Sequence, residues 1–192
     1  MISEMQKRNI ALIGFRTTGK SLTGKVLAER LSRVFVDMDD MLVATLGQDI
    51  DAWVRSHGWE SFREAESALI ETLSSRENLV VATGGGVILE ERNRKALRKG
   101  FYVVWLQAAP ETIYSRLIED PKTPSNRPPL TDLPMKEEIE RLLQERSPLY
   151  AETSDLILET DNCPAENLAL RIQAWLAEQQ REAESNNRPR RH

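Results

Sequence analysis

Eight consecutive residues near the start of the chain have the types and spacing of a loop that binds phosphate groups. They are Gly14-Phe15-Arg16-Thr17-Thr18-Gly19-Lys20-Ser21, which match the pattern GxxxxGK[ST] between an apolar stretch and a helix-like one. A glycine at each end lets the backbone wrap around phosphate oxygens, while Lys20 supplies a cation and the Ser21 hydroxyl can bind Mg²⁺. A glycine-rich turn with a surface lysine is the alternative. The flanking pattern favours a nucleotide-phosphate loop.

A group of carboxylates follows the second apolar segment, as Asp37-Met38-Asp39-Asp40. At the end of a strand, one carboxylate can hold Mg²⁺ or its water, while the next accepts a hydrogen bond from a substrate hydroxyl. The alternative, an acidic cap for a helix beginning near Met41, would need only one aspartate. The pair therefore favours one site with two carboxylate roles.

Three glycines follow the third apolar segment, as Thr83-Gly84-Gly85-Gly86. A tight turn would need only one or two of them. Three in a row let the backbone approach a ligand with no side chain in between. We interpret this run as a platform under a substrate.

Several arginines could hold an anion. Arg63 and Glu66 are three apart on a predicted helix, so they could form a weak exposed pair, or Glu66 could aim Arg63 at a substrate carboxylate. The sequence leaves these two interpretations even. Arg127 lies among prolines and could close over a transferring phosphate or be a solvated surface residue. Arg146 could bind a ligand or merely complement a helix C-terminus.

The elements that must position these residues alternate between strands and helices. The strands are expected at about Asn9–Ile13, Val34–Val36, Leu79–Thr83, Tyr102–Leu106 and Leu156–Glu159. The helices are expected at about Lys20–Leu31, Asp51–Ser74, Glu90–Arg98, Pro110–Ile118 and Met135–Glu145, with a last amphipathic helix from about Ala165. This alternation predicts an α/β fold with a parallel sheet and helices on both faces, whose ligands bind at the strand ends.

We expect a single domain over residues 1–180, with a substrate-binding helical region at about 39–66. The proline-rich stretch at about 119–134 is too irregular for a helix or strand, so we expect it to be a mobile lid. The polar stretch 181–192 is expected to be a disordered tail.

Composition excludes several classes of protein. The net charge of −4 argues against a nucleic-acid partner, and no apolar run reaches the roughly 20 residues needed to span a membrane. The single cysteine excludes an internal disulfide, and the two histidines, one of them in the polar tail, argue against a histidine triad or a zinc site. No secretory signal is visible near Met1. We expect a cytoplasmic enzyme or switch.

Taken together, the ordered motifs resemble shikimate kinase, in the nucleoside-monophosphate-kinase-like branch of P-loop proteins. The resemblance rests on the phosphate loop, the aspartate pair, the glycine run, and the segments Phe62-Arg63-Glu64-Ala65-Glu66, Arg127-Pro128 and Arg146-Ser147-Pro148-Leu149-Tyr150. It spans about residues 8 to 176. It implies a P-loop three-layer sandwich with a five-stranded parallel sheet in the order 2-3-1-4-5.

The resemblance also implies an activity: transfer of the ATP γ-phosphate to the 3-hydroxyl of shikimate, with Mg²⁺ as the cofactor and a monomer as the form. The implied catalytic residues are Lys20, Asp39 and Arg127. The implied nucleotide-binding residues are Gly14, Thr17, Thr18, Gly19, Lys20, Ser21, Leu22, Arg116 and Arg127. The implied shikimate-binding residues are Asp39, Arg63, Gly84, Gly85, Gly86 and Arg146, and the implied metal-binding residues are Ser21 and Asp37.

The chain departs from the family's pattern at three places. The family usually has a glycine at the position of Thr17 and a threonine at that of Leu22, so nucleotide affinity is expected to differ here. The segment 160–164 lacks the basic residue that the family often has near the adenine. The polar tail has no counterpart.

The phosphate loop is also compatible with three other functions. Another small-metabolite P-loop kinase, such as a gluconate or nucleotide kinase, would not need two arginines placed for a carboxylate. A nucleotide-dependent switch would normally carry Asn-Lys-x-Asp and Asp-x-x-Gly motifs, and this sequence has neither. A relative that binds ATP but lacks turnover is the remaining alternative.

Overall fold

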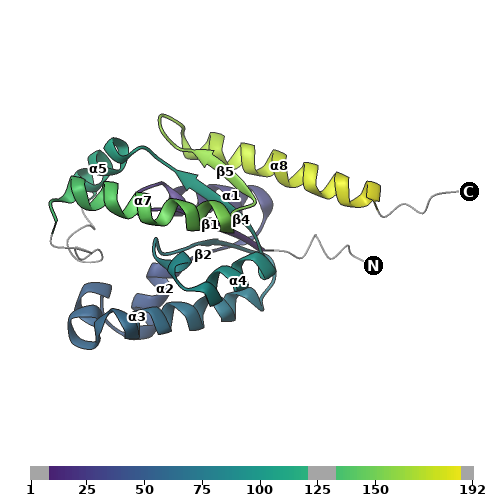
Figure 1. Cartoon of the computed structure of the whole chain (residues 1–192). Coiled ribbons are helices and arrows are strands. Elements are labelled where there is room, and N and C mark those ends of the chain that lie inside the picture. Colours follow the sequence, from purple (N-terminus) through teal and green to yellow (C-terminus); the bar gives the residue numbers. More distant parts are fainter. Residues whose placement is uncertain (1–8, 121–132, 187–192) are drawn as a thin grey trace, which may run out of the picture.

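The computed structural model describes residues 9–120 and 133–186, and these form a layered α/β fold around one sheet (Figure 1). Its five strands are parallel and lie in the order β2-β3-β1-β4-β5, which confirms the predicted topology. The strands are β1 (Asn9–Ile13), β2 (Val34–Asp37), β3 (Leu79–Ala82), β4 (Phe101–Gln107) and β5 (Leu156–Glu159).

The helices cover both faces of this sheet. They are α1 (Lys20–Leu31), α2 (Met38–Leu46), α3 (Ile50–Ser74), the short 3₁₀ helix η2 (Val87–Leu89), α4 (Glu91–Gly100), α5 (Pro110–Glu119), α7 (Met135–Thr153) and α8 (Ala165–Asn186). Helices α1 and α8 pack together on one face, and α3, α4 and α7 cover the other. The central strand β1 shows why: its side chains alternate between the two cores and are fully buried on both sides.

The pairing register brings the functional loops to one edge of the sheet. Asp37 at the end of β2 is level with Ala82 at the end of β3, and Leu12 near the end of β1 is level with the same residue. Because all strands run in one direction, the segments that leave β1, β2 and β3 emerge side by side. The phosphate loop, the aspartates and the glycine run therefore meet at this edge.

Helix α7 is longer than the sequence predicts. We expected it to end at about Glu145, before Pro148, but it continues to Thr153. Proline removes one backbone donor from a helix, and Pro148 lies on the exposed face of α7. The helix continues past it because Tyr150 and Thr153, in the next turn, are buried. Packing thus outweighs the local penalty.

Helix α8 also differs from expectation. We predicted a disordered tail from residue 181, but α8 runs to Asn186, so its first six residues are helical; the remainder of that tail lies outside the described residues. Arginine, glutamate and alanine are good helix formers, and they make up most of residues 181–186. The helix can therefore continue past its last buried residues.

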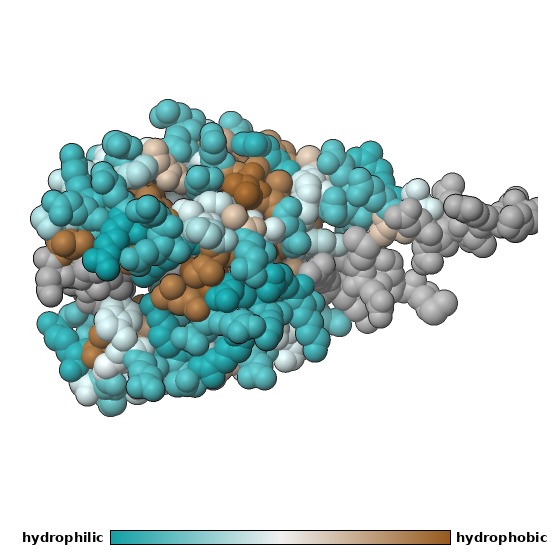
Figure 2. Space-filling view, in the orientation of Figure 1, coloured by the Kyte–Doolittle hydropathy of each residue, from teal (hydrophilic) through white to brown (hydrophobic). Residues whose placement is uncertain are grey.

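The surface of the described part is largely polar. In Figure 2, hydrophilic residues cover most of the visible face, and apolar residues on it form separate small groups. None of the helices in the two described ranges is long and apolar enough to cross a membrane.

Candidate functional site

The phosphate loop joins β1 to α1, and its shape depends on glycine. Gly14 has a φ of 142°, and a Cβ there would collide with the Leu106 carbonyl of the neighbouring strand. Gly19 has a φ of 89° at the start of α1, which is also a conformation that favours glycine. The two glycines therefore allow the tight turn by which the loop enters the N-terminus of α1.

Lys20 is buried under this loop rather than spread on the surface. Its side chain is on a residue that is only 9% exposed, and its Nζ donates to the carbonyls of Gly14 at 3.0 Å and Phe15 at 2.7 Å. A lysine that merely decorated a turn would extend into water. The surface-lysine alternative is therefore wrong, because the ammonium group is folded back onto the loop itself.

Thr17 occupies a backbone conformation that threonine seldom adopts. Its φ is 60°, in the left-handed region, and its branched side chain makes that conformation costly. Three contacts hold it there: Thr17 Oγ1 donates to the Arg16 carbonyl at 2.7 Å and to the Ile113 carbonyl at 3.4 Å, and the Thr17 carbonyl accepts from Arg116 at 3.2 Å. Glycine would adopt the same positive φ without this cost, because it has no side chain.

Ser21 and Asp37 meet across the edge of the sheet. The Ser21 hydroxyl donates to Asp37 Oδ2 at 2.5 Å, and the other oxygen, Oδ1, accepts from the backbone N–H of Asp39 at 3.1 Å. Asp37 is thus the N-cap of α2, which begins at Met38 and not near Met41. One carboxylate thus caps the helix and also accepts from the serine. Its contact with Mg²⁺ stays a prediction.

Asp39 and Glu66 converge on Gly84. A Cβ on Gly84 would lie 2.6 Å from Glu66 Oε1 and 3.0 Å from Asp39 Oδ1, so only glycine leaves room for both carboxylates. Glu66 is fully buried, and within the described residues its Oε1 has no hydrogen-bond partner. Burial raises the pKa of Glu66; Arg63 opposes that shift, and the nearby charge of Asp39 adds to it.

Arg63 is held as a fork by Glu66. Arg63 Nη1 donates to Glu66 Oε2 at 2.6 Å, and the side chains are 16% and 1% exposed. The guanidinium also lies over the rings of Trp59 and Phe62, at 5.3 and 5.5 Å from their centroids. Its far end reaches Gly86, where any Cβ would collide with it. The pair is therefore buried and is not a loose surface pair. Binding of a substrate carboxylate by Arg63 stays a prediction.

Arg146, on α7, contacts the same glycine run. It is 6% exposed in the interior of α7, its Nη1 donates to the Gly85 carbonyl at 3.5 Å, and it lies 5.7 Å from the centre of the Phe15 ring. The helix ends two turns later, at Thr153, so the alternative of a cation at a helix C-terminus is wrong. Arg63 and Arg146 therefore flank one platform.

Tyr150 is a site residue to which the sequence analysis gave no role. Its hydroxyl donates to the Gly85 carbonyl at 2.5 Å, one turn after Arg146 on the same face of α7. Burial raises the pKa of Tyr150 to about 12, so the hydroxyl keeps its proton and remains a donor at neutral pH. The spacing of four residues was the available signal, but it requires α7 to continue past Pro148.

Arg116 links three segments around the phosphate loop. It donates to the carbonyl of Thr17 at 3.2 Å and to the carbonyl of Thr160 at 2.9 Å. A cleft of about 310 Å³ opens beside it. The cleft is lined by Arg16, Thr17, Gly19, Lys20, Ser21, Leu22, Asp37, Asp39, Thr83, Gly85, Arg116 and Asp120.

The structure therefore gathers most of the predicted residues into one region. Leu22 lines the cleft and is a residue with 63% of its surface exposed. Thr18 does not line the cleft, because its hydroxyl turns inward to the Phe15 carbonyl at 2.9 Å. Arg127 and most of the expected lid, residues 121–132, lie outside the described residues.

Comparison with known proteins identifies what this arrangement is similar to. A family model described as "Shikimate kinase" matches residues 16–177. A shikimate kinase of Rhodopirellula baltica is 36% identical over 159 residues, covering 83% of this chain and 85% of that protein. A shikimate kinase of Vibrio cholerae serotype O1 is 38% identical over 174 residues, covering 90% of this chain and 97% of that protein.

Solved structures agree with the sequence matches. The structure of shikimate kinase from Acinetobacter baumannii in complex with shikimate has a TM-score of 0.85 to this chain at 33% identity. The match covers 91% of this chain and 96% of the other. The likeness therefore extends over the whole sheet and its covering helices.

Proposed function

The chain belongs to the shikimate kinase family, and from that premise we propose which of its residues transfer the γ-phosphate of ATP to the 3-hydroxyl of shikimate. The observation that carries this proposal is the pair of buried guanidinium groups that contact Gly86 and Gly85, those of Arg63 and Arg146. They lie next to a loop shaped for phosphate and to Asp39. A carboxylate site, a hydroxyl acceptor and a phosphate site are thereby neighbours.

The nucleotide is proposed to bind in the cleft beside the phosphate loop. Lys20 and the backbone at the start of α1 would face its phosphates, with Arg116 at the rim. The Ser21 hydroxyl and the Asp37 carboxylate offer the hard oxygen ligands that Mg²⁺ prefers, together with the phosphates. When bound there, Mg²⁺ neutralises charge on the β- and γ-phosphates. Arg127 is proposed to act from the segment that follows α5.

The acceptor is proposed to lie on the glycine run, with its carboxylate between Arg63 and Arg146. Arginine forks suit a planar carboxylate because they donate two parallel hydrogen bonds. Asp39 would then accept the hydrogen bond of the attacking hydroxyl, orienting it toward the phosphate loop. The protein's own contribution is positioning and electrostatics, because phosphoryl transfer needs little else from it.

Two finer points belong to the same proposal. We propose that the chain works as a monomer in the cytoplasm on two small molecules, with no nucleic acid or membrane taking part. The net charge of −4 supports the absence of a nucleic-acid partner.

A direct assay tests the proposed substrate. Purified chain with ATP and Mg²⁺ is expected to release ADP when shikimate is added, and to do so at least about a hundredfold more efficiently than with gluconate or with shikimate methyl ester, because the ester lacks the charge that two arginines require. ADP release is followed by a coupled enzyme assay. Turnover of gluconate without turnover of shikimate would overturn the substrate. Binding of ATP without turnover of any acceptor would favour the inactive relative.

Gly86→Ala is expected to raise the KM for shikimate by about tenfold and to lower stability, because a methyl group at this position would collide with the Arg63 guanidinium, including the Nη1 that donates to the buried Glu66. The control is Leu89→Ala, an exposed position three residues further along, which adds no atom to the glycine run. Steady-state kinetics measures both. Equal shikimate KM values in the two variants would separate Arg63 from the acceptor.

A further inference from the structure

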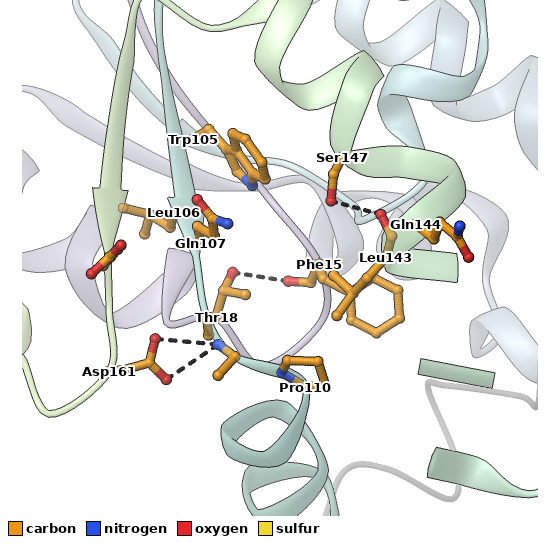
Figure 3. Close-up of a pocket in the computed structure, with 13 residues that line it drawn as sticks. Phe15, Thr18, Trp105, Leu106, Gln107, Pro110, Leu143, Gln144, Ser147 and Asp161 are labelled. Carbon is orange, nitrogen blue, oxygen red and sulfur yellow. Dashed lines mark hydrogen bonds between the residues drawn. The ribbon is translucent and has the colours of Figure 1, made fainter. Parts of the chain in front are cut away.

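A second pocket lies beside the phosphate loop, between the ends of β4 and β5 on one side and α7 on the other (Figure 3). Its volume is about 390 Å³, which is in the range of small-molecule sites. It shares no lining residue with the phosphate cleft. The roles proposed above leave it unused.

The walls of this pocket are largely apolar and are well anchored. Phe15 and Leu106 form its buried base, at 1% and 0% exposed, and Trp105, at 5%, presents an edge to it. Trp105 also stacks on Tyr150 with ring centroids 5.5 Å apart, which fixes the orientation of the indole. Pro110 and Leu143 complete the apolar surface (Figure 3). A flat hydrocarbon ring fits such walls.

The charged groups that line the pocket are all negative. No ion pair or hydrogen bond joins the Glu159 carboxylate to a described residue, and Asp161 accepts from the Ala109 N–H through both oxygens at 3.2 Å. No lysine, arginine or histidine is among the lining residues in the described part of the chain. The guanidinium groups of Arg16 and Arg146 lie over the Phe15 ring, at 5.6 and 5.7 Å from its centroid. The part of the pocket next to Glu159 therefore favours a positive charge.

From this combination we propose that the pocket binds a small ring compound that carries an ammonium or amidinium group. The ring lies against Trp105, Pro110 and Leu143, next to the buried Phe15, and the cation lies near Glu159. Gln107 and Gln144 at the margin offer further hydrogen bonds (Figure 3). Neither ATP nor a hydroxylated carboxylate has this chemistry.

The position of Phe15 links this pocket to the phosphate loop. The Phe15 carbonyl accepts from both Lys20 Nζ at 2.7 Å and Thr18 Oγ1 at 2.9 Å, and the side chains of Phe15 and Thr18 both line the pocket. A ligand packed on these two residues favours the present arrangement, in which Lys20 is bound to backbone carbonyls. Occupancy therefore raises the KM for ATP. This link rests on the proposed role of Lys20, whereas ligand binding does not.

The first experiment locates the ligand by the N–H signals of the four tryptophan indoles in the full chain, assigned with Trp→Phe variants. The probe is naphthylmethylamine, and naphthylmethanol is its neutral match. The amine is expected to shift the Trp105 signal when no nucleotide is present. It is expected to do so also when the ATP site is saturated by a non-hydrolysable ATP analogue. Shifts confined to Trp53, Trp59 or Trp175, or loss of all shifts when the analogue is added, would overturn the proposed site.

The second experiment tests the charge. Glu159→Gln is expected to weaken the amine by about threefold or more without weakening the alcohol, because a partly exposed ion pair contributes about 0.2–1 kcal/mol. Glu178→Gln on α8 removes an equal charge away from the pocket and is expected to leave both affinities unchanged. Equal loss of amine affinity in the two variants would reduce the effect to general charge and contradict the proposal.

The third experiment tests the link to the phosphate loop. In the wild-type chain, saturating amine is expected to raise the KM for ATP at least about twofold, and Glu159→Gln is expected to shift that dependence to higher amine concentration. An unchanged ATP KM at saturating amine would overturn the link while leaving the binding result intact. If shikimate were not a substrate at all, the indole shifts would still decide the binding site.

Discussion

Asp39→Asn is expected to lower kcat by about a hundredfold or more while leaving ATP affinity within about twofold, because an amide of the same shape cannot take the proton or charge-assisted hydrogen bond of the attacking hydroxyl. The substitution adds no volume near Gly84, where the Asp39 carboxylate lies beside Glu66. It removes one of the charges that raise the pKa of Glu66, so the fold is not expected to suffer. Single-turnover phosphate transfer measures the chemical step directly.

Asp40→Asn is the matched control for this variant. Asp40 is the next residue along α2 and is exposed, so the substitution changes the same net charge without entering the site. Its kcat is expected to stay close to that of the wild-type chain. A near-normal kcat in Asp39→Asn would remove Asp39 from the reaction, and equal losses in both variants would assign the effect to the net charge of α2.

Arg63→Ala is expected to raise the KM for shikimate by about thirtyfold or more and also to destabilise the chain. The first effect follows from losing a charge-assisted hydrogen bond to the substrate carboxylate, which contributes about 2 kcal/mol. The second follows because Glu66, fully buried, loses its partner; breaking a buried pair costs about 3–5 kcal/mol. Kinetics and urea unfolding measure the two effects separately.

The stability of Arg63→Ala is expected to depend on pH in a defined direction. Burial raises the pKa of Glu66 in the folded chain, so the folded chain keeps a proton that the unfolded chain has already released. Stability from this group is present below the unfolded pKa and is lost as pH rises through the folded pKa. Removing Arg63 removes the charge that opposed the shift. Unfolding compared at about pH 5.5 and about pH 8 should therefore show a steeper loss in the variant.

The double variant Arg63→Ala with Glu66→Gln separates the two effects. Without a carboxylate to leave unpaired, it is expected to recover about 2 kcal/mol of stability near neutral pH relative to the single variant. The KM for shikimate is expected to stay high, because the guanidinium is still missing. Recovery of both quantities together would mean that Arg63 acts only through the fold.

Much of this molecule could be predicted from local patterns because those patterns have local causes. Gly14, Gly19 and Lys20 are demanded by the shape of the loop itself, and the alternating apolar segments dictate a parallel sheet in which loop ends meet. The strand order followed from a resemblance carried by the motifs. These inferences did not require knowledge of packing.

The relation of Arg63 to Glu66 could not be decided in this way. Spacing on a helix shows that two side chains can meet, but whether water surrounds them depends on what packs above α3. Here Trp59, Phe62 and the glycine run exclude water. The role of Tyr150 was missed for a related reason, since a proline three residues after Glu145 is a sound local signal for the end of a helix.

The two oxygens of Asp37 have a consequence for how the two substrates influence each other. One oxygen holds the start of α2, the helix that carries Asp39, and the other faces the serine at the start of α1. A cation that binds with the nucleotide would contact Asp37 Oδ2. Because Asp37 also caps α2, this contact would change the position of the helix that carries Asp39, the proposed partner of the acceptor hydroxyl. Nucleotide and acceptor should then bind cooperatively, each tightening the other by the same factor.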